Sequence, residues 1–203
     1  MKWYIPEGYV EYFGENDHER NERLWVLENV PSGGTFIDVG ANVGTWSMSF
    51  SRHFNSVYAI EPYPLNVEAL MKNIELNSLT NIFVVSKAAS SSKGKIFLSE
   101  LWRKNDGGHV GTTAAQTQFE SESFMIDELN LSPRLIKIDV EGWGAEVLKG
   151  ATETLKRTDY VILELHDVEG DPERKFEAEV LSKWGDLVHQ SDSGTIKYYR
   201  RKQ

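Results

Sequence analysis

Two short stretches constrain the fold more than any other feature of this chain. Residues 36–44 read FIDVGANVG, and residues 57–62 read VYAIEP. Each contains an apolar run of strand length, and the segment between them is long enough for a helix, so the pattern predicts strand, glycine turn, helix and second strand. Gly40 and Gly44 allow a tight turn and a close approach of the backbone to a ligand. Glu61 falls at the carboxyl end of the second strand, the edge at which open α/β sheets bind ligands.

The composition of the glycine loop narrows the class of ligand. A dinucleotide fingerprint reads G-x-G-x-x-G, whereas this loop has Asp38, Gly40, Asn42 and Gly44 at alternate positions and lacks the middle glycine. A carboxylate at Asp38 repels a pyrophosphate and suits an ammonium group. A ligand with a ribose, an amino-acid end and no phosphate is S-adenosylmethionine. The alternative interpretation is a loop whose glycines serve packing alone.

Apolar strands alternate with helices along most of the chain. We predict strands at residues 35–39, 56–60, 82–86, 135–139 and 160–165, and helices at 44–54, 65–77, 145–157 and 172–184. A short extra strand at 95–98 and a closing hairpin at 187–190 and 195–200 complete the pattern. This alternation predicts an α/β fold with a mostly parallel sheet covered on both faces and a C-terminal antiparallel hairpin.

The domain organisation follows from the same pattern. Residues 1–34 form a prelude, with a helical apolar pattern at Leu24, Val26, Leu27 and Val30, and are expected to pack on the core. Residues 35–203 form one domain. Within it, residues 101–122 are a long polar insertion, which predicts a substrate-facing loop. His109 in that loop is either a substrate contact or a solvated side chain.

Charge and composition exclude several classes of protein. The net charge of −9 argues against a nucleic-acid partner, which usually requires a basic face. No apolar run approaches a membrane span, and the N-terminus resembles no signal peptide. The absence of cysteine excludes disulfides and thiolate chemistry. We therefore expect a cytoplasmic protein with no membrane partner; the sequence leaves the oligomeric state open.

Polar residues interrupt two later strands. Lys137 and Asp139 share one face of the strand at 135–139, and Glu164 and His166 share one face of the strand at 160–165. If these strands are neighbours, Lys137 and Glu164 form a structural buried pair. Asp139 and His166 then lie near the carboxyl edge of the sheet, where we expect them to act in catalysis.

A methyl transfer to a hydroxyl group needs a base as well as alignment of the acceptor. Asp139, Glu141 and His166 are the catalytic candidates, and the sequence does not decide between Asp139 and His166 as the base. The same three side chains also make a conceivable oxygen-rich site for a divalent metal. Their spacing does not demand one, so no metal is expected.

Several of these motifs together resemble the FkbM family of S-adenosylmethionine-dependent methyltransferases. The similarity runs from residue 35 to residue 166, and its motifs lie at residues 37–44, 59–62, 73–77, 136–142, 148–151 and 162–166. The resemblance implies the class I methyltransferase fold, a Rossmann-like three-layer sandwich with a seven-stranded sheet. It also implies O-methylation of a hydroxyl on a sugar, polyketide or other small-molecule acceptor.

The resemblance assigns roles to particular positions. It implies that Glu61 holds the ribose and that Asp139 faces the methionine end of the cofactor and the acceptor. The residues it places around the rest of the cofactor are Asp38, Gly40, Asn42, Gly44, Pro62, Lys87 and Ala88. The chain departs from the family pattern after Gly142, where Trp143 either shapes the acceptor pocket or packs.

Three alternatives remain from the sequence. A nicotinamide-dependent oxidoreductase is disfavoured by Asp38 and by Asn42 in place of a glycine. A non-catalytic module would bind S-adenosylmethionine without turnover. An N-methyltransferase acting on protein or RNA is disfavoured by the acidic balance and by the absence of an Asn-Pro-Pro-Tyr-like motif.

Overall fold

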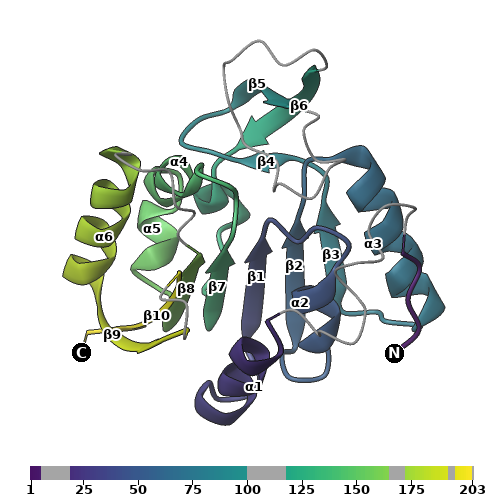
Figure 1. Ribbon diagram of the computed structural model, residues 1–203, viewed down its shortest axis with the longest axis horizontal. Helices are drawn as coiled ribbons and strands as arrows, with labels where there is room; N and C mark the ends of the chain where they lie inside the picture. The colour runs from purple at the N-terminus through teal and green to yellow at the C-terminus, as the bar shows by residue number, and fades with distance from the viewer. Residues whose placement is uncertain (6–18, 100–117, 165–171, 192–194, 203) are drawn as a thin grey trace.

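A seven-stranded sheet forms the centre of the computed structural model, which describes residues 1–5, 19–99, 118–164, 172–191 and 195–202. The strand order is β3-β2-β1-β7-β8-β10-β9 (Figure 1). The five parallel strands are β1 (Thr35–Val39), β2 (Ser56–Ile60), β3 (Ile82–Val85), β7 (Leu135–Ile138) and β8 (Tyr160–Glu164). Strand β10 (Ile196–Arg201) runs antiparallel to both β8 and β9 (Gly185–Gln190). The predicted parallel sheet and C-terminal hairpin are confirmed.

Helices cover both faces of this sheet. Helices α1 (Arg20–Asn29), α2 (Thr45–Ser49) and α3 (Pro64–Leu76) pack on one face through Val26, Trp46, Met48 and Leu70. Helices α4 (Gly144–Lys149), α5 (Thr152–Leu155) and α6 (Pro172–Trp184) pack on the other. Strands buried on both faces have continuous apolar sequences, which is why the parallel strands were recognisable.

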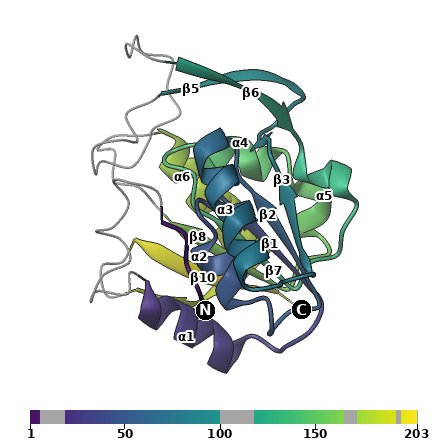
Figure 2. The ribbon, with the colours of Figure 1, turned by 90° about the vertical axis from the view of Figure 1, so that its right-hand side faces the viewer.

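A second, smaller sheet stands at the carboxyl edge of the first. It has the order β4-β6-β5, from β4 (Ala88–Ala89), β5 (Gly94–Ser99) and β6 (Gln118–Phe124), and is followed by the 3-10 helix η3 (Ile126–Leu129). Figures 1 and 2 show β5 and β6 rising beyond the ends of the parallel strands. Residues 118–122, predicted to belong to a polar loop, are instead part of β6. His109 and the rest of that loop, up to residue 117, lie outside the described residues.

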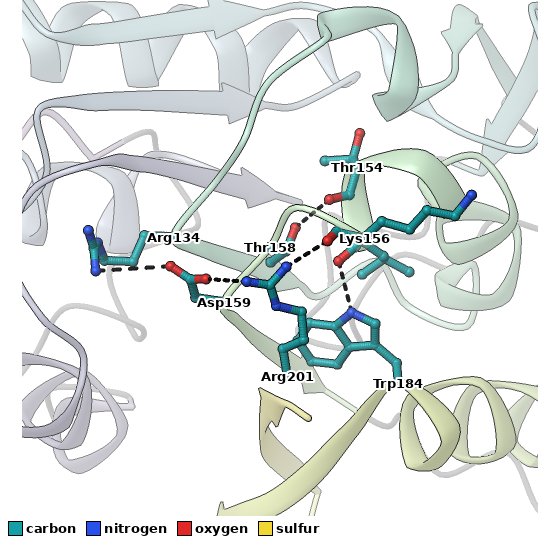
Figure 3. A network of polar contacts seen from close by, with 8 residues as sticks. Arg134, Thr154, Lys156, Thr158, Asp159, Trp184 and Arg201 are labelled. Atoms are coloured by element: carbon teal, nitrogen blue, oxygen red, sulfur yellow. Dashed lines mark hydrogen bonds and ion pairs between the residues drawn. The ribbon is translucent and has the colours of Figure 1, made fainter. Parts of the chain in front are cut away.

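The opposite, amino edge of the sheet is held by a polar network (Figure 3). Asp159, just before β8, accepts a hydrogen bond from Arg201 Nη2 at 3.1 Å and lies 4.0 Å from Arg134 Nη1. Arg201 also donates to the carbonyl oxygen of Lys156 at 2.6 Å. These contacts join β10, the last strand along the chain, to the segment between α5 and β8.

Three helices differ from their predicted form. The helix expected at 44–54 is shorter, because α2 ends at Ser49. The helix expected at 145–157 is divided into α4 and α5 at Gly150, where an added Cβ would lie 1.9 Å from the carbonyl oxygen of Ser90. This close backbone approach interrupts the helix. Helix α1 forms as expected, but it buries Arg23 and Val26, whereas Leu24 and Leu27 are exposed.

Parts of the N-terminal prelude contact the domain. The backbone N–H of Lys2 donates to Asn77 Oδ1 at 2.8 Å, Trp3 packs against the core, and Trp25 packs on His189 and Tyr198 of β9 and β10. These contacts favour the predicted packing of residues 1–34 on the domain. In the parts of the chain that the structure describes, no helix has the length and apolar character needed to cross a membrane.

Candidate active site

The glycine loop packs closely against the end of β2, the backbone after β7 and helix α3. The backbone N–H groups of Gly40 and Ala41 both donate to the carbonyl oxygen of Ile60 at 3.0 Å. Gly40 has a φ of +82°, and a Cβ added there would lie 1.8 Å from the carbonyl oxygen of Asp139. Gly44 has a φ of +98°, and its added Cβ would lie 2.5 Å from Leu70 Cδ1. Only glycine fits both positions without displacement of the neighbours.

Glu61 organises the loop from the end of β2. The backbone N–H of Asn42 donates to Glu61 Oε2 at 2.8 Å, and that of Tyr63 donates to Oε1 at 2.9 Å. Burial raises the pKa of Glu61 to about 7, although the hydrogen bonds from Tyr63, Asn42 and Asn66 oppose that shift. A carboxylate has about four acceptor positions, and these three bonds leave Glu61 capacity for a hydroxyl donor from a ligand.

The raised pKa of Glu61 predicts a pH-dependent stability. The folded protein holds this proton more tightly than the unfolded chain, so the stabilisation is complete below pH 4.5 and is lost as the pH rises through about 7. Relative to Glu61→Gln, we expect the wild-type free energy of unfolding to fall by about 3 kcal/mol between about pH 4 and about pH 8. Urea denaturation across this range measures the difference. Parallel pH profiles of the two proteins would contradict it.

A pocket opens beside Glu61 at the carboxyl edge of the sheet. The space within it, counted together with the open solvent at its mouth, is about 540 Å³. The residues that line it end or follow β1 and β2, follow β7, or belong to β4 and β5: Val39, Gly40, Ile60, Glu61, Pro62, Tyr63, Ala88, Ala89, Ile96, Leu98, Asp139, Val140 and Trp143. The pocket is therefore mainly apolar, with Glu61 and Asp139 as its carboxylates.

The pocket gathers some of the predicted residues and omits others. Gly40, Glu61, Pro62, Ala88 and Asp139 line it together. Asp38, Asn42 and Gly44 do not line it, although they build the loop around it. Lys87 does not line it either, because its ammonium pairs with Glu122 at 2.7 Å on the outer side of the small sheet.

The sequence did not identify the walls contributed by the second sheet and by the segment after β7. Ile96 and Leu98 come from β5, and Trp143 precedes α4. The indole Nε1 of Trp143 is buried and has no hydrogen-bond partner among the described residues. A buried N–H without an acceptor is costly, so this group suits a ligand that supplies one. Trp143 both lines this pocket and packs against the core, and its predicted role at an acceptor pocket stays a prediction.

Asp38 lies beneath the loop and is fully buried. Its Oδ2 accepts a hydrogen bond from Ser47 Oγ at 2.6 Å, whereas its Oδ1 has no partner within the described part of the chain. Burial raises the pKa of Asp38, and the nearby Lys137 ammonium opposes the shift. The amide oxygen Asn42 Oδ1 is also buried without a described partner. Two buried acceptors near the pocket favour a ligand that carries hydrogen-bond donors or a positive charge.

Lys137 is buried, but its direct partner differs from the prediction. Its Nζ pairs with Asp139 Oδ2 at 2.7 Å, two residues along the same strand face, rather than with Glu164. Glu164 and Glu19 contribute at longer range, and together with Asp139 they raise the pKa of Lys137 against the effect of burial. The ammonium also lies over the ring of Trp46, 5.2 Å from its centroid.

Three carboxylates from separate elements meet near this lysine. One oxygen each from Glu19, Asp139 and Glu164 lies within 4.8 Å of the others, a spacing that a metal ion could bridge. This trio differs from the predicted set of Asp139, Glu141 and His166. Glu141 is half-buried with a φ of +47° and does not line the pocket. His166 lies outside the described residues.

Comparisons with known proteins place this geometry in context. A family profile described as the methyltransferase FkbM domain matches residues 38–188. The hexuronic acid methyltransferase AglP of Haloferax volcanii is 33% identical over 146 residues, which cover 70% of this chain and 59% of that protein. The chain thus spans less than two thirds of the length of this relative.

Solved structures share the fold. A methyltransferase FkbM from Methylobacillus flagellatus matches with a TM-score of 0.59 and 18% identity, over 83% of this chain and 43% of that one. A putative tRNA (m1A22) methyltransferase of Streptococcus pneumoniae, solved with S-adenosyl-L-methionine, matches with a TM-score of 0.54 and 16% identity, over 90% of this chain and 73% of that one. Both likenesses confirm the predicted class I methyltransferase fold.

Proposed function

Because the chain belongs to the FkbM family of methyltransferases, we propose that it transfers a methyl group from S-adenosylmethionine to a hydroxyl oxygen of a sugar or other small-molecule acceptor. The observation that carries this proposal is the apolar pocket beside Glu61. S-adenosylmethionine supplies an electrophilic methyl group on a sulfonium, whose bonding electron pair stays on sulfur when the acceptor oxygen takes the methyl group.

The residues of the pocket fit this cofactor. Glu61 keeps acceptor capacity for a ribose hydroxyl beside its bonds to Asn42, Tyr63 and Asn66, and an acidic residue at this position of an open α/β sheet binds the ribose. Pro62, Tyr63 and Ala88 supply apolar surface for the adenine. The buried Asp38, with one oxygen that has no partner among the described residues, suits an amino-acid ammonium near the glycine loop.

Asp139 is the pocket carboxylate that we assign to the acceptor. It lines the pocket and is held by Lys137, so its carboxylate is fixed at the carboxyl edge of the sheet. We assign it the role of orienting the acceptor hydroxyl, and Asp139 or His166 the role of accepting its proton. The apolar walls from Ile96, Leu98 and Trp143 exclude water from the reacting groups.

Two observations favour a sugar acceptor. The relative from Haloferax volcanii is named for hexuronic acid, and the net charge of −9 disfavours a polyanionic substrate such as RNA. The structural likeness to a putative tRNA methyltransferase is a likeness of fold.

The test is a methyl-transfer assay with S-adenosylmethionine and a panel of hexuronates, neutral sugars and unmodified tRNA. We expect a mass gain of one methylene unit on a sugar, and a loss of kcat of about a hundredfold in Asp139→Asn at saturating S-adenosylmethionine. The exposed Asp186→Asn is the matched control. Transfer to tRNA alone would overturn the acceptor class, and full turnover in Asp139→Asn would remove Asp139 from the mechanism.

His166→Ala separates the two candidate bases. If His166 accepts the proton, His166→Ala loses more turnover than Asp139→Asn, at unchanged cofactor affinity. The reverse pattern assigns the proton to Asp139.

A further inference from the structure

The charges around Lys137 form a cluster that we call the carboxylate cage, composed of Asp38, Glu19, Asp139 and Glu164. All four carboxylates act electrostatically on the Lys137 ammonium, which is 2% exposed. They come from different elements: Asp38 from β1, Glu19 from just before α1, Asp139 from just after β7 and Glu164 from the end of β8. Folding has therefore assembled an acidic cluster around one cation.

Specific contacts hold the cage in place. Trp46 Nε1 donates to Glu19 Oε2 at 2.8 Å, and the same indole lies beneath the Lys137 ammonium. Lys137 Nζ binds Asp139 Oδ2 at 2.7 Å. One oxygen each from Glu19, Asp139 and Glu164 lies within 4.8 Å of the others. These side chains form a pre-organised group at one place on the sheet.

A second observation links the cage to a ligand. Asp38 lies directly opposite Lys137 in the register of β1 and β7, so both side chains leave the same face of the sheet. Asp38 is fully buried, and its Oδ1 has no hydrogen-bond partner among the described residues. Asp139 belongs both to the cage and to the pocket wall. The negative field of the cage therefore reaches the end of the pocket at which Asp139 lies.

We propose that the carboxylate cage makes this protein bind S-adenosylmethionine more tightly than its demethylated product, S-adenosylhomocysteine. The inference rests on the proposed function. The two molecules share adenosine and amino-acid groups, but the sulfur is a cation in the first and neutral in the second. A field that stabilises the sulfonium loses this interaction when the methyl group has left. The cage thus favours cofactor entry and product release.

Calorimetric titration with the two ligands tests the proposal. We expect S-adenosylmethionine to bind about tenfold more tightly than S-adenosylhomocysteine to the wild-type chain. Glu164→Gln and Glu19→Gln each remove one charge of the cage at nearly constant shape, and each is expected to reduce this ratio several-fold. Glu75→Gln, an exposed residue of α3, is the matched control and should keep the wild-type ratio.

The outcomes separate the inference from the proposed function. Equal affinities, tighter binding of the product, or an unchanged ratio in both cage variants would overturn the inference and leave the function standing. Binding of neither ligand would overturn both. A further titration, with Mg²⁺ or Mn²⁺ alone, tests whether the cage binds a metal ion. A bound metal ion that is lost in Glu164→Gln would overturn the inference, because the cage would then serve a metal site rather than the sulfonium.

Discussion

Replacing Gly40 by alanine is expected to reduce the free energy of unfolding by about 3 kcal/mol or more. The residue has a φ of +82°, and the new Cβ would lie 1.8 Å from the carbonyl oxygen of Asp139. That oxygen belongs to backbone directly after β7, so no side-chain rotation relieves the overlap. Strands β1 and β7 are hydrogen-bonded neighbours at the centre of the sheet, and forcing them apart disturbs both the core and the pocket. Chemical denaturation measures the loss.

Gly142→Ala provides a matched control for this prediction. Gly142 has a nearly identical φ of +84°, but a Cβ added there meets no atom within 4 Å. The control carries the conformational strain without the overlap, so we expect it to cost only about 1 kcal/mol. Similar losses in the two variants would show that β1 and β7 are not as closely joined as this structure has them.

Replacing Glu61 by alanine is expected to weaken binding of S-adenosylmethionine by about a hundredfold. The substitution removes the carboxylate that would accept the ribose hydroxyls and leaves the N–H groups of Asn42 and Tyr63 without their acceptor. The apolar core does not depend on this side chain, so the circular dichroism spectrum should keep its folded shape. Calorimetry measures the affinity of the variant.

Glu68→Ala is the control for Glu61→Ala. Glu68 is an exposed residue of α3 that pairs with Lys72, and its loss should leave cofactor affinity unchanged. Wild-type affinity in Glu61→Ala would be inconsistent with a ribose site at this carboxylate.

The central layers of the fold were predictable because their physical signals are local. Strands β1, β2, β7 and β8 are apolar runs, and an interior parallel strand shows its character without reference to its neighbours. Glycine and glutamate at fixed offsets from these strands located the loop and the end of β2. The class I methyltransferase fold follows from these signals together with the resemblance.

Strand β6 was missed for a specific reason. Its inward-facing residues Ser121 and Ser123 are buried, whereas Glu120 and Glu122 are exposed. Buried and exposed residues alternate along this strand in the structure. Serine and glutamate are both polar, however, so the sequence shows no alternation of apolar and polar residues. Strand β4 has two residues, which is too short for any pattern. Because β4 and β6 were missed, the second sheet was not recognised, and Ile96 and Leu98 of β5 were not identified as walls of the pocket.

The carboxylate cage could not be predicted from the sequence because it depends on tertiary contacts. Glu19 lies in the prelude, far along the chain from Asp139 and Glu164, and no periodicity relates them. The buried lysine itself was recognisable as a polar residue in an apolar strand. Its partner was not, because strand adjacency suggested Glu164 whereas the side chain turns along its own strand to Asp139.

The most direct measurement is a calorimetric titration of the purified chain with S-adenosylmethionine, with NAD as the comparison ligand. The pocket beside Glu61 predicts micromolar binding of S-adenosylmethionine, and the loop, which lacks the middle glycine of a dinucleotide fingerprint, predicts no binding of NAD. Binding of NAD, or of neither ligand, would contradict the assignment of this site to methyl transfer.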